Sequence, residues 1–168
     1  MEIRVLTEHD ANAWRALRIE ALESEPYAFS ASVAELRSAN IEDIRLRLRA
    51  GANFVMGAFA DGTLSGVAGF VREQGEKSRH KGFVWGVYVS QRWRGQGVGR
   101  RLMTSLIEKA RAQPGLERIT LHVATLQVAA RQLYDSLDFE PFGYERESLK
   151  VAGVYVDEVF LVLRLPTP

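Results

Sequence analysis

A short glycine-rich turn holds the residues of this chain whose types and spacing are best suited to chemistry. Gly95, Gly97 and Gly99 follow an apolar run and directly precede a stretch with helical periodicity. Glycine lets a backbone approach an anion closely, and the first turn of a helix offers unpaired N–H groups and the positive end of its dipole. Arg94 and Arg100 add positive charge to the turn. The turn therefore predicts a site for a pyrophosphate group.

Other phosphate-binding motifs fit these residues less well. A dinucleotide-binding fingerprint needs a third glycine where Arg100 stands, and an acidic residue after the next strand, about 20 residues further on. The next strand-like run is at residues 119–123. A Walker loop needs a Gly-Lys-Ser/Thr sequence, which the chain lacks. Two alternatives stay open: a tight turn that binds nothing, and a binding module for another phosphorylated ligand.

The spacing Arg94-x-x-Gly97-x-Gly99, placed after a strand, resembles the acyl-CoA-binding motif of the GCN5-related N-acetyltransferases. The resemblance implies that acetyl-CoA is the co-substrate and that the turn holds its pyrophosphate. It implies contacts from the preceding strand, from the turn and from a later helix. The implied cofactor-binding residues are Val87, Tyr88, Val89, Arg94, Gly95, Gln96, Gly97, Val98, Gly99, Arg100, Gln127, Ala130 and Tyr134.

A second segment, residues 121–139, resembles another motif of the same family. In that motif a small residue and a Leu-Tyr pair follow an asparagine, and here the pair ends at Tyr134. Gln127 replaces the asparagine and keeps a carboxamide on a longer stem. Asp138 replaces the glycine that ends the helix, and aspartate is one of the few residues that accept a left-handed conformation.

Length and composition predict a single domain over residues 1–168. Of the 168 residues, 46% are hydrophobic and 26% are charged, which allows a sizeable core. The net charge of +1 does not favour nucleic acid, and no apolar run approaches the length of a membrane span. The start lacks the apolar core of a signal peptide, and the chain has no cysteine and 3 histidines. We expect a cytoplasmic protein without disulfides, a cysteine nucleophile or a metal site.

Apolar patterning predicts an α+β fold with three layers. It predicts strands at residues 3–6, 54–60, 64–72, 83–89, 119–123, 142–149 and 155–165. It predicts a first helix that has Thr7 as its N-cap and ends before Pro26, and further helices at 42–50, from Val98 to a stop at Pro114-Gly115, and at 127–137. The first helix should bury Trp14, Leu17, Ile19 and Leu22, and Asp61-Gly62 should form a hairpin turn. Residues 83–89 should form a central strand buried on both faces. The result is a mixed, mostly antiparallel central sheet of about seven strands flanked by about four helices, which is also the family's element order.

Acyl transfer from a thioester to an amine requires three chemical groups. A base must take a proton from the ammonium, a donor must stabilise charge on the carbonyl oxygen, and an acid assists the departing thiolate. The resemblance implies the backbone N–H of Val89 as the donor and Tyr134 as the general acid. The alternative role of Tyr134 is that of a core aromatic residue.

The base is less clearly indicated than the acid. Trp85 stands where many family members carry a glutamate on the central strand, and tryptophan cannot accept a proton. His122 stands five residues before Gln127, where the ribosomal-protein-alanine N-acetyltransferases of this superfamily carry a catalytic glutamate. Because an imidazole ordinarily titrates near neutral pH, His122 is the candidate base, directly or through water. A hydrogen-bonded structural histidine is the alternative.

The resemblance implies that the acceptor amine binds between the first helices and the final hairpin, because these segments flank the thioester in the family's fold. The candidate substrate-binding residues are Glu25, Tyr27, Phe29, Tyr155 and Glu158. The sequence leaves open whether the acceptor is a small molecule or a peptide or protein N-terminus. It also leaves open a non-catalytic acyl-CoA-binding or regulatory module, which Trp85 and Gln127 suggest. A homodimer through sheet edges or the last strands is a further alternative, for which no residue pattern gives support.

Overall fold

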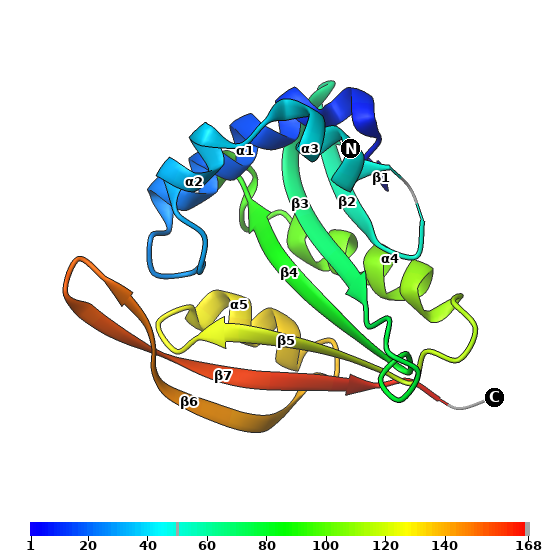
Figure 1. Cartoon of the computed structure of the whole chain (residues 1–168). Helices are drawn as coiled ribbons and strands as arrows, with labels where there is room; N and C mark the ends of the chain where they lie inside the picture. Colours follow the sequence, from blue (N-terminus) through cyan, green and yellow to red (C-terminus); the bar gives the residue numbers. More distant parts are fainter. Residues whose placement is uncertain (50, 167–168) are drawn as a thin grey trace.

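A seven-stranded sheet forms the centre of the computed structural model, which describes residues 1–49 and 51–166 (Figure 1). The strands are β1 (Glu2–Val5), β2 (Phe54–Ala60), β3 (Thr63–Arg72), β4 (Lys81–Val89), β5 (Arg118–Ala124), β6 (Glu140–Val151) and β7 (Val154–Arg164). They lie in the order β1-β2-β3-β4-β5-β7-β6, and only β4 and β5 pair in parallel. The predicted mixed, mostly antiparallel sheet is confirmed.

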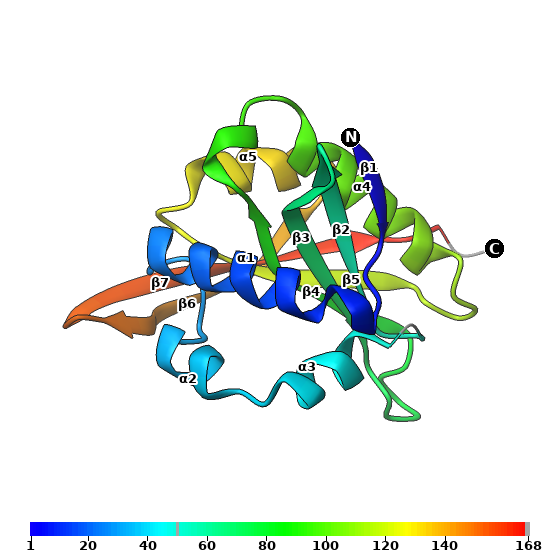
Figure 2. The same ribbon diagram turned by 90° about the horizontal axis from the view of Figure 1, so that it is seen from above.

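Helices cover both faces of this sheet (Figure 2). The described part of the chain holds α1 (Ala11–Ser24), α2 (Val33–Ser38), α3 (Ile41–Leu48), α4 (Val98–Arg111) and α5 (Val128–Asp135), with 3-10 turns at Glu8–Asp10 and Gln91–Trp93. The first three α-helices lie on one face, and α4 and α5 lie on the other. Each face has its own buried apolar cluster, so the three-layer class is confirmed. None of the helices described is long and apolar enough to cross a membrane.

Helix α4 shows how an apolar stripe positions the glycine turn. Val98, Leu102, Leu106 and Ala110 recur at intervals of four residues, and all four are buried. They belong to one cluster with residues of β2, β3 and β5, because residues four apart lie on one face of a helix. This packing fixes the N-terminus of α4, and with it the turn, beside the end of β4.

Strands β4 and β5 part soon after they begin. Their pairing covers only Lys81–Phe83 against Arg118–Thr120, and beyond it the strands diverge (Figure 1). The expectation that residues 83–89 are buried on both faces is met only in part: Val84 and Tyr88 are buried in the clusters on the two faces. Trp85 and Val87, which line the opening between β4 and β5, are only partly buried.

Three details of the helices differ from the expectation. Helix α2 was not predicted, because this short polar helix buries none of its residues and so has no apolar stripe. Helix α3 begins one residue early and ends at Leu48, while residue 50 lies outside the described residues. In α1 Trp14, Leu17 and Leu22 are buried as expected, whereas Ile19 is only partly buried and the adjacent Arg18 is buried.

An ion pair at the start of α1 should make stability depend on pH in the acidic range. Two guanidinium nitrogens of Arg4 donate to the Asp10 carboxylate at 2.8 Å, and the Thr7 backbone N–H donates to it at 2.7 Å. These bonds lower the pKa of Asp10 to about 2. Because an unfolded aspartate has a pKa of about 3.9, the ion pair stabilises the fold above that value. Its contribution is lost as the pH falls toward the folded pKa.

We expect Asp10→Asn to lower the free energy of unfolding by about 1–2 kcal/mol at neutral pH, after allowance for solvent screening. The loss should be much smaller near pH 2.5, where wild-type Asp10 is itself partly protonated. Denaturant titrations at the two pH values measure both quantities. Asp61→Asn, which removes the same charge from an exposed turn, is the control. An equal loss for Asp10→Asn at both pH values would show that the ion pair contributes nothing.

Candidate active site

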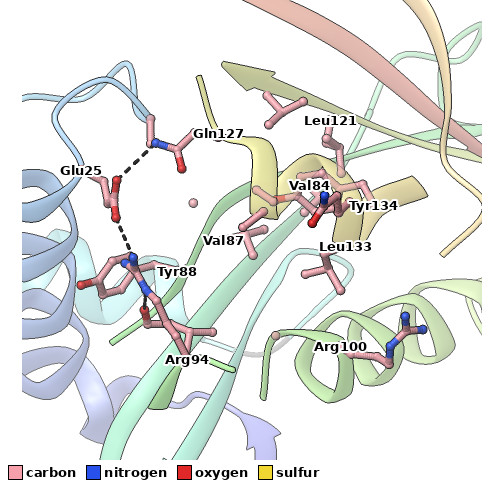
Figure 3. Close-up of a pocket in the computed structure, with 18 of the residues that line it drawn as sticks. Glu25, Val84, Val87, Tyr88, Arg94, Arg100, Leu121, Gln127, Leu133 and Tyr134 are labelled. Carbon is pink, nitrogen blue, oxygen red and sulfur yellow. Dashed lines mark hydrogen bonds and ion pairs between the residues drawn. The ribbon is translucent and has the colours of Figure 1, made fainter. Parts of the chain in front are cut away.

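A cleft of about 570 Å³ lies between the diverging strands β4 and β5 (Figure 3). Its lining comes from both strands, from the turn before α4 and from α5. It contains nearly all the expected cofactor-binding residues: Val87, Tyr88, Val89, Arg94, Gly95, Gly97, Val98, Gly99, Arg100, Gln127, Ala130 and Tyr134. Gln96 is not in the lining, and its side chain donates to the carbonyl of Arg92 at 3.1 Å. The two sequence motifs therefore meet in one cleft.

The glycine turn leaves open space at the N-terminus of α4. Gly95 and Gly97 have positive φ angles of 73° and 74°, a conformation that glycine adopts without steric cost. Gly97 is the N-cap of α4, and a Cβ on Gly95 or Gly97 would meet no atom within 4 Å. The first-turn N–H groups and the helix dipole thus border room for an anion. This geometry fits a diphosphate.

The two arginines of the turn have different surroundings. Arg94 donates through Nε to the carbonyl of Val89 at 2.9 Å and through Nη1 to Glu25 at 2.7 Å, so its side chain braces the turn. Arg100 lies in the first turn of α4, and its side chain reaches the end of α5, where it donates to the hydroxyl of Ser136 at 2.7 Å. Within the described residues Arg100 has no carboxylate partner, so its charge is available to a phosphate.

A chain of side chains crosses the cleft (Figure 3). One carboxylate oxygen of Glu25 accepts from Arg94, and the other accepts from Nε2 of Gln127 at 3.2 Å. Glu25 thereby links the end of α1 to the glycine turn and to the start of α5. Both groups expected to contact ligands, the Glu25 carboxylate and the Gln127 amide, are used in this link.

The backbone of Val89 faces the cleft. The N–H of Ser90 donates to the carbonyl of Ser65 at 2.8 Å, and Gly66 lies opposite Val89. Because hydrogen-bonded and non-hydrogen-bonded pairs alternate along an antiparallel ladder, the N–H and C=O of Val89 point away from β3. The carbonyl accepts from Arg94 on that side. The Val89 N–H is therefore directed toward the space between β4 and β5.

Tyr134 lies on α5 and lines the cleft (Figure 3). The residue is only 5% exposed, and its ring meets the edge of Phe139 with 5.9 Å between centroids. Burial raises the pKa of its hydroxyl far above the ordinary value. No described residue hydrogen-bonds to that hydroxyl. Tyr134 thus holds an unused proton at the wall of the cleft, although it is also a core residue.

His122 lies where the cleft meets a second cavity of about 460 Å³. The residues shared by both linings include Phe29, Trp85 and His122. The imidazole stacks on Phe160 with 3.9 Å between ring centroids and meets the edge of Phe83 at 5.1 Å. No described residue hydrogen-bonds to the imidazole, so its nitrogens are free to exchange protons with water or a ligand.

The second cavity contains some of the expected acceptor-binding residues. Phe29 and Glu158 line it, and Glu25 lines only the first cleft. Tyr27 lies in neither lining. Tyr155 also lies in neither and is 52% exposed near the tip of the β6–β7 hairpin, where Lys150 donates to its hydroxyl at 3.1 Å. The structure thus does not bring Tyr27 or Tyr155 to the site.

Sequence reasoning missed several polar residues of the second cavity. Arg18 lies on α1, and Glu145 and Ser148 lie on β6. Trp14, Arg18 and Leu22 are spaced by four residues, so a charged residue in the middle of an apolar stripe was the available signal. Glu145 and Ser148 gave no comparable signal, because only the pairing of β6 with β7 places them beside Glu158.

The fold and the cleft match the class that the two motifs resemble: a mixed sheet with diverging central strands, and a glycine turn at a helix N-terminus between them. The acetyltransferase (GNAT) family model matches residues 14–139, which is most of the chain. The chain belongs to the GNAT acetyltransferase family, whose members use acetyl-CoA.

Three bacterial proteins are similar to this chain in sequence or in structure. N-alpha-acetyltransferase RimI from Mycobacterium tuberculosis (strain ATCC 25618 / H37Rv) is 36% identical over 101 residues, which cover 60% of this chain and 61% of that protein. The ribosomal-protein-alanine N-acetyltransferase from Brucella melitensis superposes with a TM-score of 0.83 at 26% identity, over 98% of this chain and 100% of that one. The structure of yncA from Salmonella typhimurium with its cofactor acetyl-CoA gives a TM-score of 0.82 at 22% identity, over 100% and 95% of the chains.

We expect Gly97→Asp to weaken acetyl-CoA binding at least about tenfold, or about 1.4 kcal/mol. The new carboxylate would occupy and repel the diphosphate position, whereas aspartate tolerates the left-handed conformation. Gly62→Asp is the matched control, because Gly62 has a φ of 75° and its added Cβ would also meet no atom within 4 Å. Calorimetric titration of both variants measures the change. Unchanged affinity in Gly97→Asp would remove the turn from the binding site.

Proposed function

We propose that this protein transfers the acetyl group of acetyl-CoA directly to a primary amine in a ternary complex. The observation that carries the proposal is the meeting of two cavities between β4 and β5. One lies beside the glycine turn, the other beside α1 and β6, and His122 and Trp85 line both. Two substrates that enter from opposite sides meet at the opening between the strands. Because the chain has no cysteine, no thiol is available to carry an acetyl intermediate.

The first cleft suits acetyl-CoA. The N–H groups at the start of α4, together with Arg100, would hold the diphosphate, and β4 and α5 would flank the pantetheine arm. The co-substrate supplies an acetyl group activated as a thioester. The Arg94–Glu25–Gln127 link lies at the same cleft and holds the turn in place.

Three groups of the chain serve the reaction in this proposal. His122 takes a proton from the ammonium, directly or through water, because an amine attacks only with a free lone pair. The Val89 N–H stabilises negative charge on the acetyl oxygen. Tyr134 gives its proton to the departing sulfur. The new N–C bond forms as the C–S bond breaks, and overall one proton is released per ammonium acetylated.

The acceptor is a primary amine of a small molecule or of a peptide or protein N-terminus. Similarity to RimI and to the Brucella melitensis enzyme supports acetylation of an α-amine. Release of free thiol from acetyl-CoA in the presence of amino acids, polyamines, aminoglycosides and peptides tests the proposal. Binding of acetyl-CoA without turnover of any amine would favour a non-catalytic acyl-CoA-binding module. We place the reaction in the cytoplasm, which suits a chain without cysteine.

We expect Tyr134→Phe to lower kcat at least about tenfold and to leave the Kd of acetyl-CoA nearly unchanged, as loss of a transition-state interaction should. Initial-rate assays measure kcat, and calorimetry measures the Kd of acetyl-CoA. Tyr144→Phe is the control, because it removes a hydroxyl from an exposed tyrosine that bonds Asp157 outside both cavities. If kcat does not change in Tyr134→Phe, the residue has only its core role.

We expect His122→Phe to reduce kcat/KM at neutral pH by about 10²-fold or more. Phenylalanine keeps the stacking on Phe160 and removes only the base. The deficit should shrink as the pH rises, because more of the amine is then already deprotonated. A pH–rate profile of wild type and variant measures this. Parallel profiles at all pH values would exclude His122 as the base.

A further inference from the structure

Arg18 is a buried cation without a carboxylate partner among the described residues. It lies on α1, lines the second cavity and is only 6% exposed. One guanidinium nitrogen donates to the carbonyl of Gly86 over 3.4 Å. The ring of Phe29 covers the group, with 4.7 Å from the guanidinium carbon to the ring centroid. Most of its N–H donors therefore have no acceptor among residues 1–49 and 51–166.

The isolation of Arg18 is costly for the fold. Burial of a charge without a partner destabilises a protein. Burial and the proximity of Arg47 lower the pKa of Arg18 to about 10, so the group remains charged at neutral pH. Support of the β4 backbone at Gly86 requires only one weak hydrogen bond, for which a charge is unnecessary. A ligand that brings an anion accounts for the charge.

The surroundings of Arg18 are rich in donors and poor in acceptors. Arg47 of α3 also lines the cavity and makes no ion pair within the described residues. The indole N–H groups of Trp14 and Trp85, two further lining residues, are buried and have no acceptor there. The two N–H groups are themselves covered by protein, so they add buried donors near Arg18 but do not reach the cavity. A ligand oxyanion would find no competing carboxylate at this end.

The opposite wall of the same cavity carries negative charge. Glu145 and Glu158 line it from β6 and β7, and the hydroxyl of Ser148, which has one hydrogen to donate, lies 2.6 Å from a carboxylate oxygen of Glu158 and 3.2 Å from one of Glu145. Neither glutamate forms an ion pair with a described lysine or arginine. His122, the proposed base, lines this cavity as well. The cavity therefore has a cationic end on the helices and an anionic end on the hairpin.

We propose that the acceptor is a small amine that also carries a carboxylate, as a free amino acid does, with the carboxylate bound by Arg18. This inference rests on the proposed acetyl transfer. The ammonium group then faces Glu145, Glu158 and His122, where it loses its proton. The carboxylate takes no part in the bonds formed or broken. A cavity of about 460 Å³ is in the size range of small-ligand sites.

Free amino acids fit this cavity better than peptide N-termini do. In a peptide the carboxyl group nearest to the α-amine is part of an amide bond and carries no charge. It offers Arg18 one neutral carbonyl instead of a bidentate carboxylate, which is the partner that matches a guanidinium best. A peptide acceptor would leave the buried charge without a counterion.

The test compares the free L-amino acids with their carboxamides and with short peptides. Thiol release gives kcat/KM for each acceptor, and calorimetry measures acceptor binding with and without CoA. For the preferred side chain, wild type should favour the free acid over its amide at least about tenfold. The amine of the amide is the weaker base, so more of it is unprotonated at neutral pH, which by itself favours turnover of the amide. We expect the preference for the free acid despite this advantage.

Arg18→Met removes the charge and keeps the length of the side chain. It should abolish the preference for the free acid while the Kd of acetyl-CoA stays unchanged. Its unfolding midpoint should not fall, because the variant removes an unpaired buried charge. Arg15→Met on the same helix is the control, since Arg15 lies outside both cavities and should leave preference and affinity unchanged.

The outcomes separate this inference from the proposed function. Equal or faster turnover of amides and peptides by wild type would overturn the carboxylate site and leave acetyl transfer intact. Binding of acetyl-CoA without binding or acetylation of any amino acid would also overturn it. A lower unfolding midpoint in Arg18→Met with an unchanged acid preference would assign Arg18 a purely structural role. Failure to bind acetyl-CoA would count against the proposed function itself.

Discussion

The site depends on the early separation of β4 from β5. The two strands share pairing only over Lys81–Phe83 and Arg118–Thr120, and every feature of the site lies in or beside the space that opens after it. Two facing strand edges ordinarily satisfy each other's backbone groups. Here they are available to a ligand instead. An extended ligand arm that inserts between them meets backbone donors such as the Val89 N–H.

A bulge in β4 adjusts the strand to this opening. One residue of β3, Ala68, lies opposite both Gly86 and Val87, and Gly86 has a φ of 63°. Such a bulge bends its strand and increases the local twist. The Gly86 carbonyl reaches Arg18, and the adjacent Trp85 packs directly on Gly69, where a Cβ would lie 2.2 Å from the indole. The bulge thus connects the strand edge, the buried arginine and the tryptophan that lines both cavities.

Local patterns predicted much of this architecture. Apolar runs, with alternation in the last of them, predicted the seven strands, the stripe on α4 predicted its packing, and the glycines predicted the turn that borders the cleft. The limits have physical causes. The separation of β4 from β5 depends on long-range pairing, which leaves no periodic trace in the strand itself. The polar lining of the second cavity combines α1 with β6 and β7, which are far apart in the chain. Arg18 alone carried a local signal, as a charge within an apolar stripe.

The position of Glu25 has a consequence for the two segments that border the first cleft, the glycine turn and the start of α5. The Glu25 carboxylate accepts from Arg94 of the glycine turn and from Gln127 at the start of α5. Glu25 itself follows directly after α1, the helix that carries Arg18. A ligand that draws either partner away from Glu25 changes the free energy with which the other is held. By thermodynamic linkage, any effect of a contact at Arg94 on the way Gln127 is held is matched by an equal effect in reverse. A single glutamate thus couples the glycine turn to the start of α5 within the first cleft.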